Sequence, residues 1–132
     1  AVNAADVHYL SFKNYLLPEA QKKGIAIIGM KVTTRSRILS SWTPPPLEQQ
    51  TDERLRTPKP GTISIKEALT YNMSLAVSTT IIGVDSLAQI EENVKIASEF
   101  TPLSQSQLEE IELKTLSVAR QALYFRRWDL GA

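Results

Sequence analysis

The chain has 132 residues, the size of one ordinary domain with a single core. Hydrophobic residues at 42% and charged residues at 22% exclude a disordered chain, and a formal charge of +1 gives no reason to expect binding to nucleic acid or to an anionic membrane. The absence of cysteine excludes disulfides, thiolate metal sites and thiol catalysis, and no apolar run reaches the roughly 20 residues of a membrane helix.

The first residues, AVNAADVHY, contain neither Met nor the basic segment of a signal peptide, as expected for the interior of a longer protein. Residues 2–7 are a candidate strand. A helix is predicted after Ser11, because Phe12 begins a run of apolar residues at helical spacing. Pro18 predicts a kink or a restart in that helix, and Gly24 predicts its end.

An apolar run, IAIIGMKV, occupies residues 25–32 and predicts a parallel strand that is buried on both faces. Gly29 within it indicates a close approach of the backbone to a neighbour, or a bend. Residues 33–63, which are rich in proline, predict a long loop with one helical turn around residues 35–39. Loops of this length inside a compact domain are usually functional or mobile.

Residues 64–100 predict a helix, a strand at residues 79–84 and a second helix. Both helices are predicted to begin with capping boxes, at Ser64 with Glu67 and at Ser86 with Gln89. The second helix carries an apolar stripe that is predicted to face the core, formed by Leu87, Ile90, Val94 and Ala97.

One last long helix is predicted over residues 104–128. Ser104 and Gln107 match a capping box at its start, and Arg126 and Arg127 lie near its end. Its apolar side is formed by Leu108, Ile111, Thr115, Val118 and Ala122.

Strands that alternate with helices of these lengths predict an α/β fold with parallel strand pairing. Two or three strands leave exposed edges, whereas a closed barrel takes about eight strands and typically ~250 residues. We therefore expect residues 1–132 to form a single domain that is part of a TIM (β/α)8 barrel. It would comprise roughly the last three strands with their helices and a C-terminal helix, and its open edges would favour self-association.

The run IIGVDSLAQIEEN predicts a strand that ends at Gly83 and a helix that begins a few residues later. Free N–H groups at a helix start favour an anion, and the loops after the last two strands of a barrel commonly bind phosphate. A plain connection is the alternative that the pattern alone favours, and the carboxylate of Asp85 would repel a phosphate. Gln89, Glu92 and Asn93 share one side of the helix, where they contact either a base or only solvent.

The run EALTYNMSLAVSTTIIGVDSLAQIEENVKIA resembles the end of an aldo/keto reductase. In that family a helix with an "EAL" start leads to a strand similar to VSTVIVG, and a helix containing "EEN" follows. LLPEAQKKGIAIIGMKV resembles the preceding helix and the seventh barrel strand, and FTPLS resembles the exit from the last barrel helix. The resemblance covers nearly the whole chain, less clearly the proline-rich loop and the final helix.

The resemblance implies an oxidoreductase that reduces aldehydes and ketones by hydride transfer from NADPH or NADH, without a metal. The dinucleotide and a small carbonyl substrate are the partners that it implies for the complete enzyme. Carried over by position, Asn3 would lie near the nicotinamide. The other implied cofactor contacts are Met30 and Lys31 after the seventh strand, Gly83, Val84 and Asp85 beside the adenosine phosphate, and Gln89, Glu92 and Asn93 on the next helix, with Asn93 at the adenine.

This chain departs from the family pattern in two ways. Members that prefer NADP often carry Lys or Arg beside the 2′-phosphate, where this chain has Val84, Asp85 and Gln89, so the choice between NADP and NAD stays open. The family's catalytic Asp, Tyr, Lys and His come from the first four strands, which this chain lacks, so no catalytic residue is predicted in it. His8 and the four tyrosines are interpreted as structural residues.

Trp42, beside three prolines in the long loop, either covers a ligand or anchors the loop. Arg126, Arg127 and Trp128 suit a solvated helix end better than an anion site. The leading hypothesis is a C-terminal segment of a cytoplasmic aldo/keto reductase that binds cofactor and does not move the proton. The alternatives are a non-catalytic partial barrel that self-associates or pairs with a partner chain, and a residual nucleotide-binding module.

Overall fold

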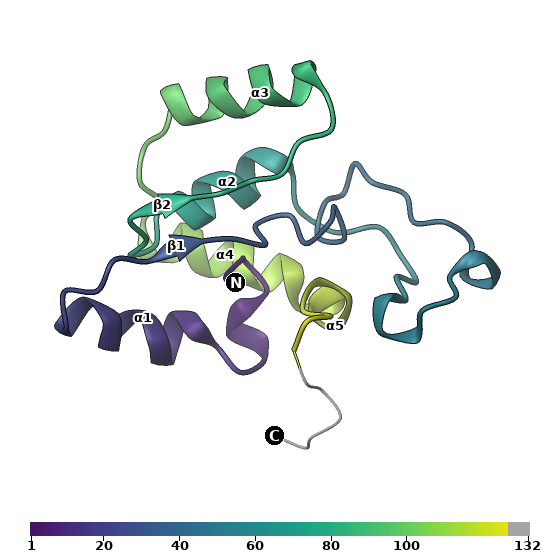
Figure 1. Cartoon of the computed structure of the whole chain (residues 1–132), viewed down its shortest axis with the longest axis horizontal. Helices are drawn as coiled ribbons and strands as arrows, with labels where there is room; N and C mark the ends of the chain where they lie inside the picture. The colour runs from purple at the N-terminus through teal and green to yellow at the C-terminus, as the bar shows by residue number, and fades with distance from the viewer. Residues whose placement is uncertain (127–132) are drawn as a thin grey trace.

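The computed structural model describes residues 1–126, apart from the side chain of Arg54. The helices are α1 (Phe12–Lys22), α2 (Ile65–Met73), α3 (Leu87–Ser98), α4 (Gln105–Thr115) and α5 (Ala119–Ala122), and the strands are β1 (Ile28–Gly29) and β2 (Thr79–Thr80) (Figure 1). Four short 3-10 turns are η1 (Asp6–His8), η2 (Leu47–Gln49), η3 (Glu53–Leu55) and η4 (Leu116–Val118).

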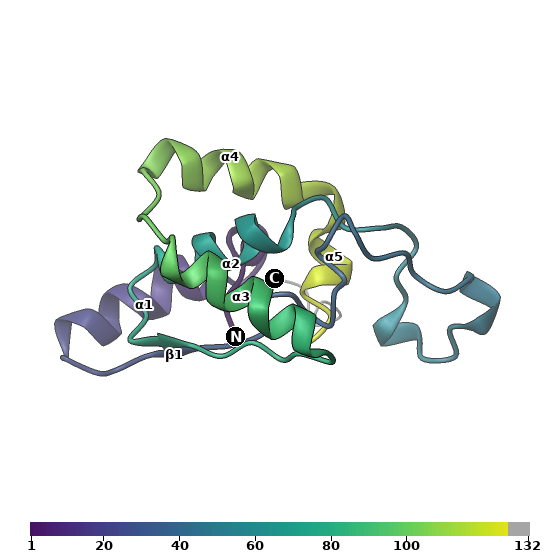
Figure 2. The ribbon, with the colours of Figure 1, turned by 90° about the horizontal axis from the view of Figure 1, so that it is seen from above.

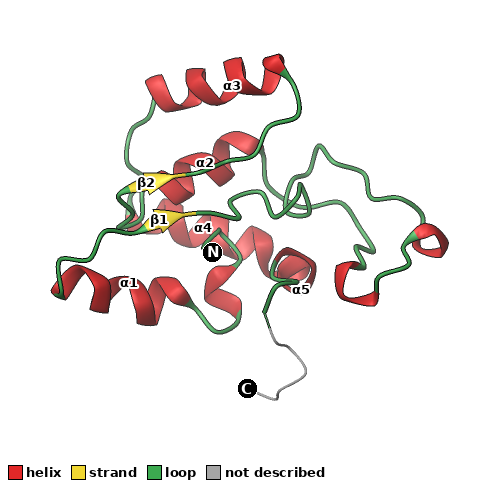
Figure 3. Ribbon diagram, viewed as in Figure 1, coloured by secondary structure: helices red, strands yellow, loops and turns green. Residues whose placement is uncertain are grey.

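The expected partial barrel with three strands is wrong. The described residues hold a single sheet of two short strands, and helices and loops make up the rest (Figure 3). The parallel direction predicted for these two segments is confirmed, with Ile28 opposite Thr79 and Gly29 opposite Thr80. The fold is therefore a helical one that contains a small parallel sheet.

Local hydrogen bonds explain why the third strand is missing. The side-chain oxygen of Asn3 accepts the N–H of Ala5 at 2.9 Å, and its carbonyl accepts the N–H of Asp6 at 3.0 Å. Asn favours such turns because its side-chain oxygen can accept the N–H of the residue two positions later, as a backbone carbonyl would in a turn. Only the N–H of Val2 reaches the carbonyl of Met30, at 3.1 Å, so residues 2–7 turn back rather than extend along β1.

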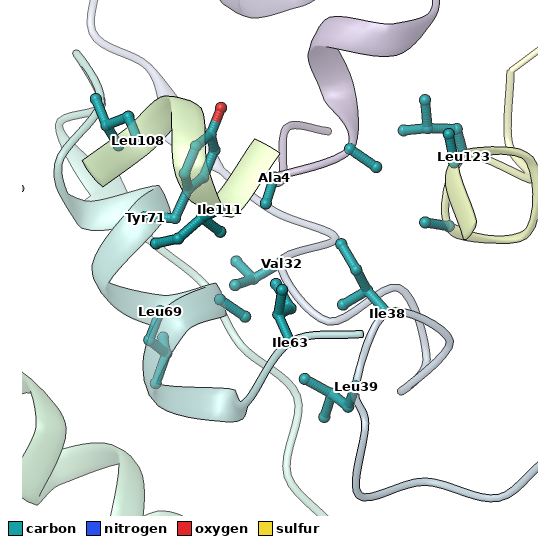
Figure 4. Close-up of a cluster of buried hydrophobic side chains, with 14 of the residues drawn as sticks. Ala4, Val32, Ile38, Leu39, Ile63, Leu69, Tyr71, Leu108, Ile111 and Leu123 are labelled. Atoms are coloured by element: carbon teal, nitrogen blue, oxygen red, sulfur yellow. The ribbon is translucent and has the colours of Figure 1, made fainter. Parts of the chain in front are cut away.

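The strands form the outermost of three layers, with α2 behind them and α4 behind α2 (Figure 2). The opposite face of the sheet is uncovered, and Ile28, Met30 and Ile81 are exposed on or beside it. The prediction of a strand buried on both faces is therefore wrong. The core lies instead between α2, α4, α5 and residues 32–39, with Val32, Ile38, Ile63, Tyr71 and Leu123 among its members (Figure 4).

The apolar stripe on α3 faces solvent instead of the core. Leu87 and Val94 are 69% and 62% exposed, whereas Ile96, outside the predicted stripe, is 8% exposed. The helix packs against α2 and has no second layer on its outer side. The predicted orientation of this helix is therefore wrong.

The expected single helix over residues 104–128 is interrupted. The predicted capping box of Ser104 and Gln107 is confirmed, but α4 ends at Thr115 and η4 separates it from α5. The hydroxyl of Thr115 lies 2.8 Å from the carbonyl of Glu112 and 2.9 Å from that of Ala4, which competes with regular helix bonding. Arg127 and Trp128, at the end of the predicted helix, lie outside the described residues.

A buried ion pair joins the two ends of the described chain. Arg126 donates to Asp6 at 2.5 Å, and the two side chains are only 5% and 0% exposed. Asp6 also accepts the N–H groups of Phe12 and Lys13 at the start of α1. Arg126 is therefore a buried structural residue and not the solvated helix end that was expected.

Residues 61–63 close the base of the long loop against residues 38–40. Gly61 donates to the carbonyl of Leu39 at 3.1 Å, and Thr62 donates to that of Ile38 at 3.0 Å. A Cβ added at Gly61 would lie 2.0 Å from the carbonyl carbon of Ile38, so only glycine allows this approach. The two ends of the long loop are thus hydrogen-bonded to each other at the core.

We predict that Gly61→Ala lowers the free energy of unfolding by about 3 kcal/mol, because backbone atoms have to move apart. Gly83→Ala is the control, since its Cβ would meet no atom within 4 Å and should change stability by less than about 1 kcal/mol. Urea unfolding followed by circular dichroism measures both values. Equal stability of the two variants would contradict the close packing at Gly61.

A second prediction concerns Glu67 in the capping box of α2. Burial alone would raise its pKa, but hydrogen bonds from the Ser64 N–H and from Lys114 outweigh this and hold the pKa below the ordinary value of 4.5. A lowered folded-state pKa stabilises the protein above pH 4.5, and this stabilisation is lost as the pH falls through the folded value.

Glu67→Gln should therefore be less stable than the original chain at pH 7, and the difference should shrink below pH 4.5. Thermal unfolding across this pH range measures it, with Glu110→Gln, which removes an exposed partner of the same lysine, as the control. A difference that stays constant with pH would contradict the role of the charge.

Candidate functional site

The two loops that leave the parallel strands lie side by side. The strands run in the same direction, so residues 30–36 after β1 and residues 81–85 after β2 emerge at one edge of the sheet. The N–H of Ile81 donates to the carbonyl of Gly29 at 2.8 Å, which continues the contact beyond the strands. Ligands commonly bind at this carboxyl edge of parallel strands.

The side chain of Asn72, on α2, fixes the two strands relative to each other. Its amide nitrogen donates to the carbonyl of Val2 at 2.8 Å, and its oxygen accepts the hydroxyl of Thr80 at 2.8 Å. A Cβ at Gly29 would lie 2.6 Å from the same oxygen, so the close approach predicted at Gly29 is confirmed. This fully buried amide thereby links the N-terminal segment, β1 and β2.

Two cavities adjoin at the carboxyl edge of the strands, and together we call them the strand-end hollow. The first, of about 520 Å³, is lined by residues 30–36, residues 81–85 and Trp42. The second, of about 390 Å³, is lined by Thr33, Ser36, Leu39, Ser40, Ser41, Ser64, Ile65, Ile82, Gly83, Asp85, Gln89, Glu92 and Asn93. They share the residues Thr33, Ser36, Ile82, Gly83 and Asp85.

The structure brings together eight of the nine residues that the resemblance implied as cofactor contacts, and Asn3 is the exception. The first cavity is lined by Met30, Lys31, Gly83, Val84 and Asp85. The second is lined by Gly83, Asp85, Gln89, Glu92 and Asn93. Asn3 does not line either cavity: it is buried, and its amide nitrogen donates to the carbonyl of Lys31 at 3.2 Å.

Sequence reasoning missed the hydroxyl-rich wall formed by residues 33–41. Within it Thr34, Arg35 and Ser36 have φ angles of 52°, 54° and 66°, so the expected helical turn is replaced by a left-handed one. A positive φ angle costs about 1–2 kcal/mol at each residue other than glycine. Backbone strain of this kind clusters at functional sites. The run TTRS contains no glycine to signal this conformation, which explains why the sequence did not predict it.

Several hydrogen-bond donors of the hollow are unused. Among the described residues, the backbone N–H groups of residues 31–36 have no acceptor. The side-chain oxygen of the buried Thr34 also has no partner there. Successive free N–H groups in a turn form a concavity that suits an anion.

The start of α3 offers fewer donors than expected. Ser86 caps the helix by accepting the N–H of Gln89, as predicted, but the side chain of Gln89 accepts the N–H of Asp85 at 2.7 Å rather than that of Ser86. The amide of Asp85 is therefore already occupied.

The charges that line the hollow are balanced. Lys31 and Arg35 lie on one wall, and Asp85 and Glu92 lie on the other. Among the described residues none of the four forms a salt bridge, so all are free to meet a ligand. The described residues contain no group of three or more His, Cys, Asp or Glu side chains that could hold a metal ion.

The other candidate residues, His8, Tyr71 and Trp42, make structural contacts. The ring of His8 lies 2.8 Å from the carbonyl of Glu112 and 3.1 Å from the hydroxyl of Thr115, which agrees with its structural interpretation. Tyr71 is buried and donates to Glu112 at 2.6 Å, and burial together with that carboxylate raises its pKa well above the ordinary value. Trp42 lines the first cavity and also packs against the core, so it both borders a cavity and anchors the loop.

Comparison with protein-family models, with curated proteins and with solved structures finds no match to this chain. Among residues 1–126, no helix combines the length and apolar character that crossing a bilayer requires. The case for function therefore rests on the residues and their geometry.

We predict that Asn72→Leu lowers the free energy of unfolding by about 3 kcal/mol, because it leaves the Val2 carbonyl and the Thr80 hydroxyl without their buried partner. Thr70→Val is a matched control on the same helix, since its hydroxyl bonds only within α2, and it should cost less than about 1 kcal/mol. Urea unfolding measures both. A cost at Asn72 no larger than that at Thr70 would contradict the linking role of this amide.

Proposed function

We propose that the strand-end hollow binds a nicotinamide dinucleotide, NADP or NAD, and that the chain is the cofactor-binding part of an aldo/keto reductase. The observation that carries this proposal is the convergence of the eight residues. They were chosen from two stretches of sequence about 50 residues apart, and they line two cavities that share part of their walls. The parallel pairing of β1 and β2 brings the two stretches to one edge of the sheet.

The chemistry of the hollow fits such a ligand. The free N–H groups of residues 31–36 and the cations of Lys31 and Arg35 suit phosphate oxygens. The carboxylate of Glu92 suits ribose hydroxyls, which can donate hydrogen bonds to it. The amide of Asn93 can pair with the donor and acceptor edge of adenine.

The bound cofactor would supply the hydride that reduces a small carbonyl substrate. The residues of this chain would hold it and would not transfer the proton. The side chains of Tyr71 and His8 are committed to Glu112 and Thr115, and among the described residues no Tyr or His lines the hollow. We therefore expect no aldehyde turnover by the isolated chain.

The proposal is tested by titrating the full 132-residue chain, in the background Trp128→Phe, with NADPH and with NADH. Trp42 is then the only tryptophan and borders the first cavity, so binding should quench its emission by energy transfer to the reduced nicotinamide. Asn93→Ala should weaken binding about tenfold, the effect of one lost hydrogen bond. Asp85→Asn should tighten it several-fold at low salt, because a carboxylate no longer faces the phosphates.

Ser98→Ala, at the far end of α3 and outside both cavities, is the control and should bind as the original chain does. Binding of neither cofactor at millimolar concentration, or equal binding by the Asn93 variant, would overturn the proposal. Light scattering on the same samples tests the alternative of self-association through the uncovered sheet face.

A further inference from the structure

The wall of the strand-end hollow is held from outside by α5. The side-chain amide of Gln121 donates to the carbonyl of Arg37 at 2.9 Å and to the carbonyl of Lys59 at 2.9 Å. Gln121 is 6% exposed, and both of its amide hydrogens are used. One side chain thus ties together the two arms of the long loop.

A second residue near α5 reaches the same wall. The ring of Tyr124 lies 4.8 Å from the guanidinium carbon of Arg37 and 6.0 Å from that of Arg35. Cations at these distances from a ring face are attracted to it. Arg35 itself lines the first cavity, so this contact ends directly at the hollow.

The wall needs such support because it is strained. Thr34, Arg35 and Ser36 are held in the left-handed region, and conformations of this kind persist only where the surroundings over-determine them. Within the turn, Arg37 donates to the carbonyl of Thr34 at 3.3 Å and Leu39 to that of Ser36 at 2.9 Å. The contacts from Gln121 and Tyr124 reach residues 35 and 37 from outside the turn.

We propose that Gln121 is a positioning residue that fixes the shape of the strand-end hollow through Arg37 and Lys59. Without its two hydrogen bonds the turn loses its support from α5, and residues 34–36 relax from the left-handed region. This inference rests on the proposed function in so far as the positioned ligand is a dinucleotide. The mechanical part of it does not depend on the ligand.

The test compares Gln121→Glu with the original chain. The carboxylate has the same shape but cannot donate, so both carbonyls lose their partner. We expect amide hydrogen exchange at the hydrogen-bonded residues within 34–40, which are Arg37, Leu39 and Ser40, to become at least about tenfold faster. The dissociation constant for NADPH should rise about tenfold. Gln121→Met, which also lacks the donors but introduces no charge, should give the same pattern if the glutamate variant fails to fold.

Thr115→Val is the matched control. It also removes buried side-chain hydrogen bonds near the junction of α4 and α5, but the partners of the Thr115 hydroxyl are Ala4, His8 and Glu112 rather than the loop. Thr115→Val should lower overall stability, but exchange at residues 34–40 should rise no more than exchange elsewhere in the chain. A merely structural role of Gln121 would make the two sites behave alike.

The outcomes separate this inference from the proposed function. If the original chain binds no dinucleotide, the proposed function fails and hydrogen exchange alone decides the role of Gln121. If exchange at residues 34–40 is the same in the Gln121 variants as in the original chain, the inference is overturned. It is also overturned if exchange rises but a measurable affinity for NADPH does not change.

Discussion

The whole arrangement depends on one buried amide, that of Asn72. A two-stranded parallel sheet is not stable alone, and here it holds because this amide accepts from Thr80 and donates to Val2 while Gly29 leaves room above it. A buried amide without partners would be strongly destabilising, so the three segments must meet in one register. That register places the two following loops beside each other, and the strand-end hollow is the result.

Signals that act over a few residues were readable from the sequence. The capping boxes at Ser64 and Ser104 formed as predicted, because a cap needs only its own first turn. The parallel direction of the two apolar segments was also predictable from their apolar pattern and the alternation of strands with helices, and the close approach at Gly29 was one of the two alternatives that the sequence offered. The length of the strands was not, because it depends on where Asn3 and the left-handed Lys31 turn the chain away.

The same division applies to the site. The eight residues of the two strand ends were placed by the resemblance to the aldo/keto reductases, and they lie together because the two strands that they follow are parallel neighbours. The hydroxyl-rich wall could not, since nothing in the run TTRS indicates a left-handed turn and its supports lie over 80 residues away at Gln121 and Tyr124. Outward-facing Leu87 shows the converse: an amphipathic stripe does not say which side is buried.

The closed base of the long loop determines how much the loop can change in length. The wall of the hollow ends near residue 42, and the two arms of the loop are joined again at residues 59–63. The proline-rich segment between them therefore does not form part of the wall. Lengthening a flexible excursion adds little entropic penalty, since the closure term grows only with the logarithm of its length. A change in the length of this segment should therefore leave the hollow beneath it unchanged.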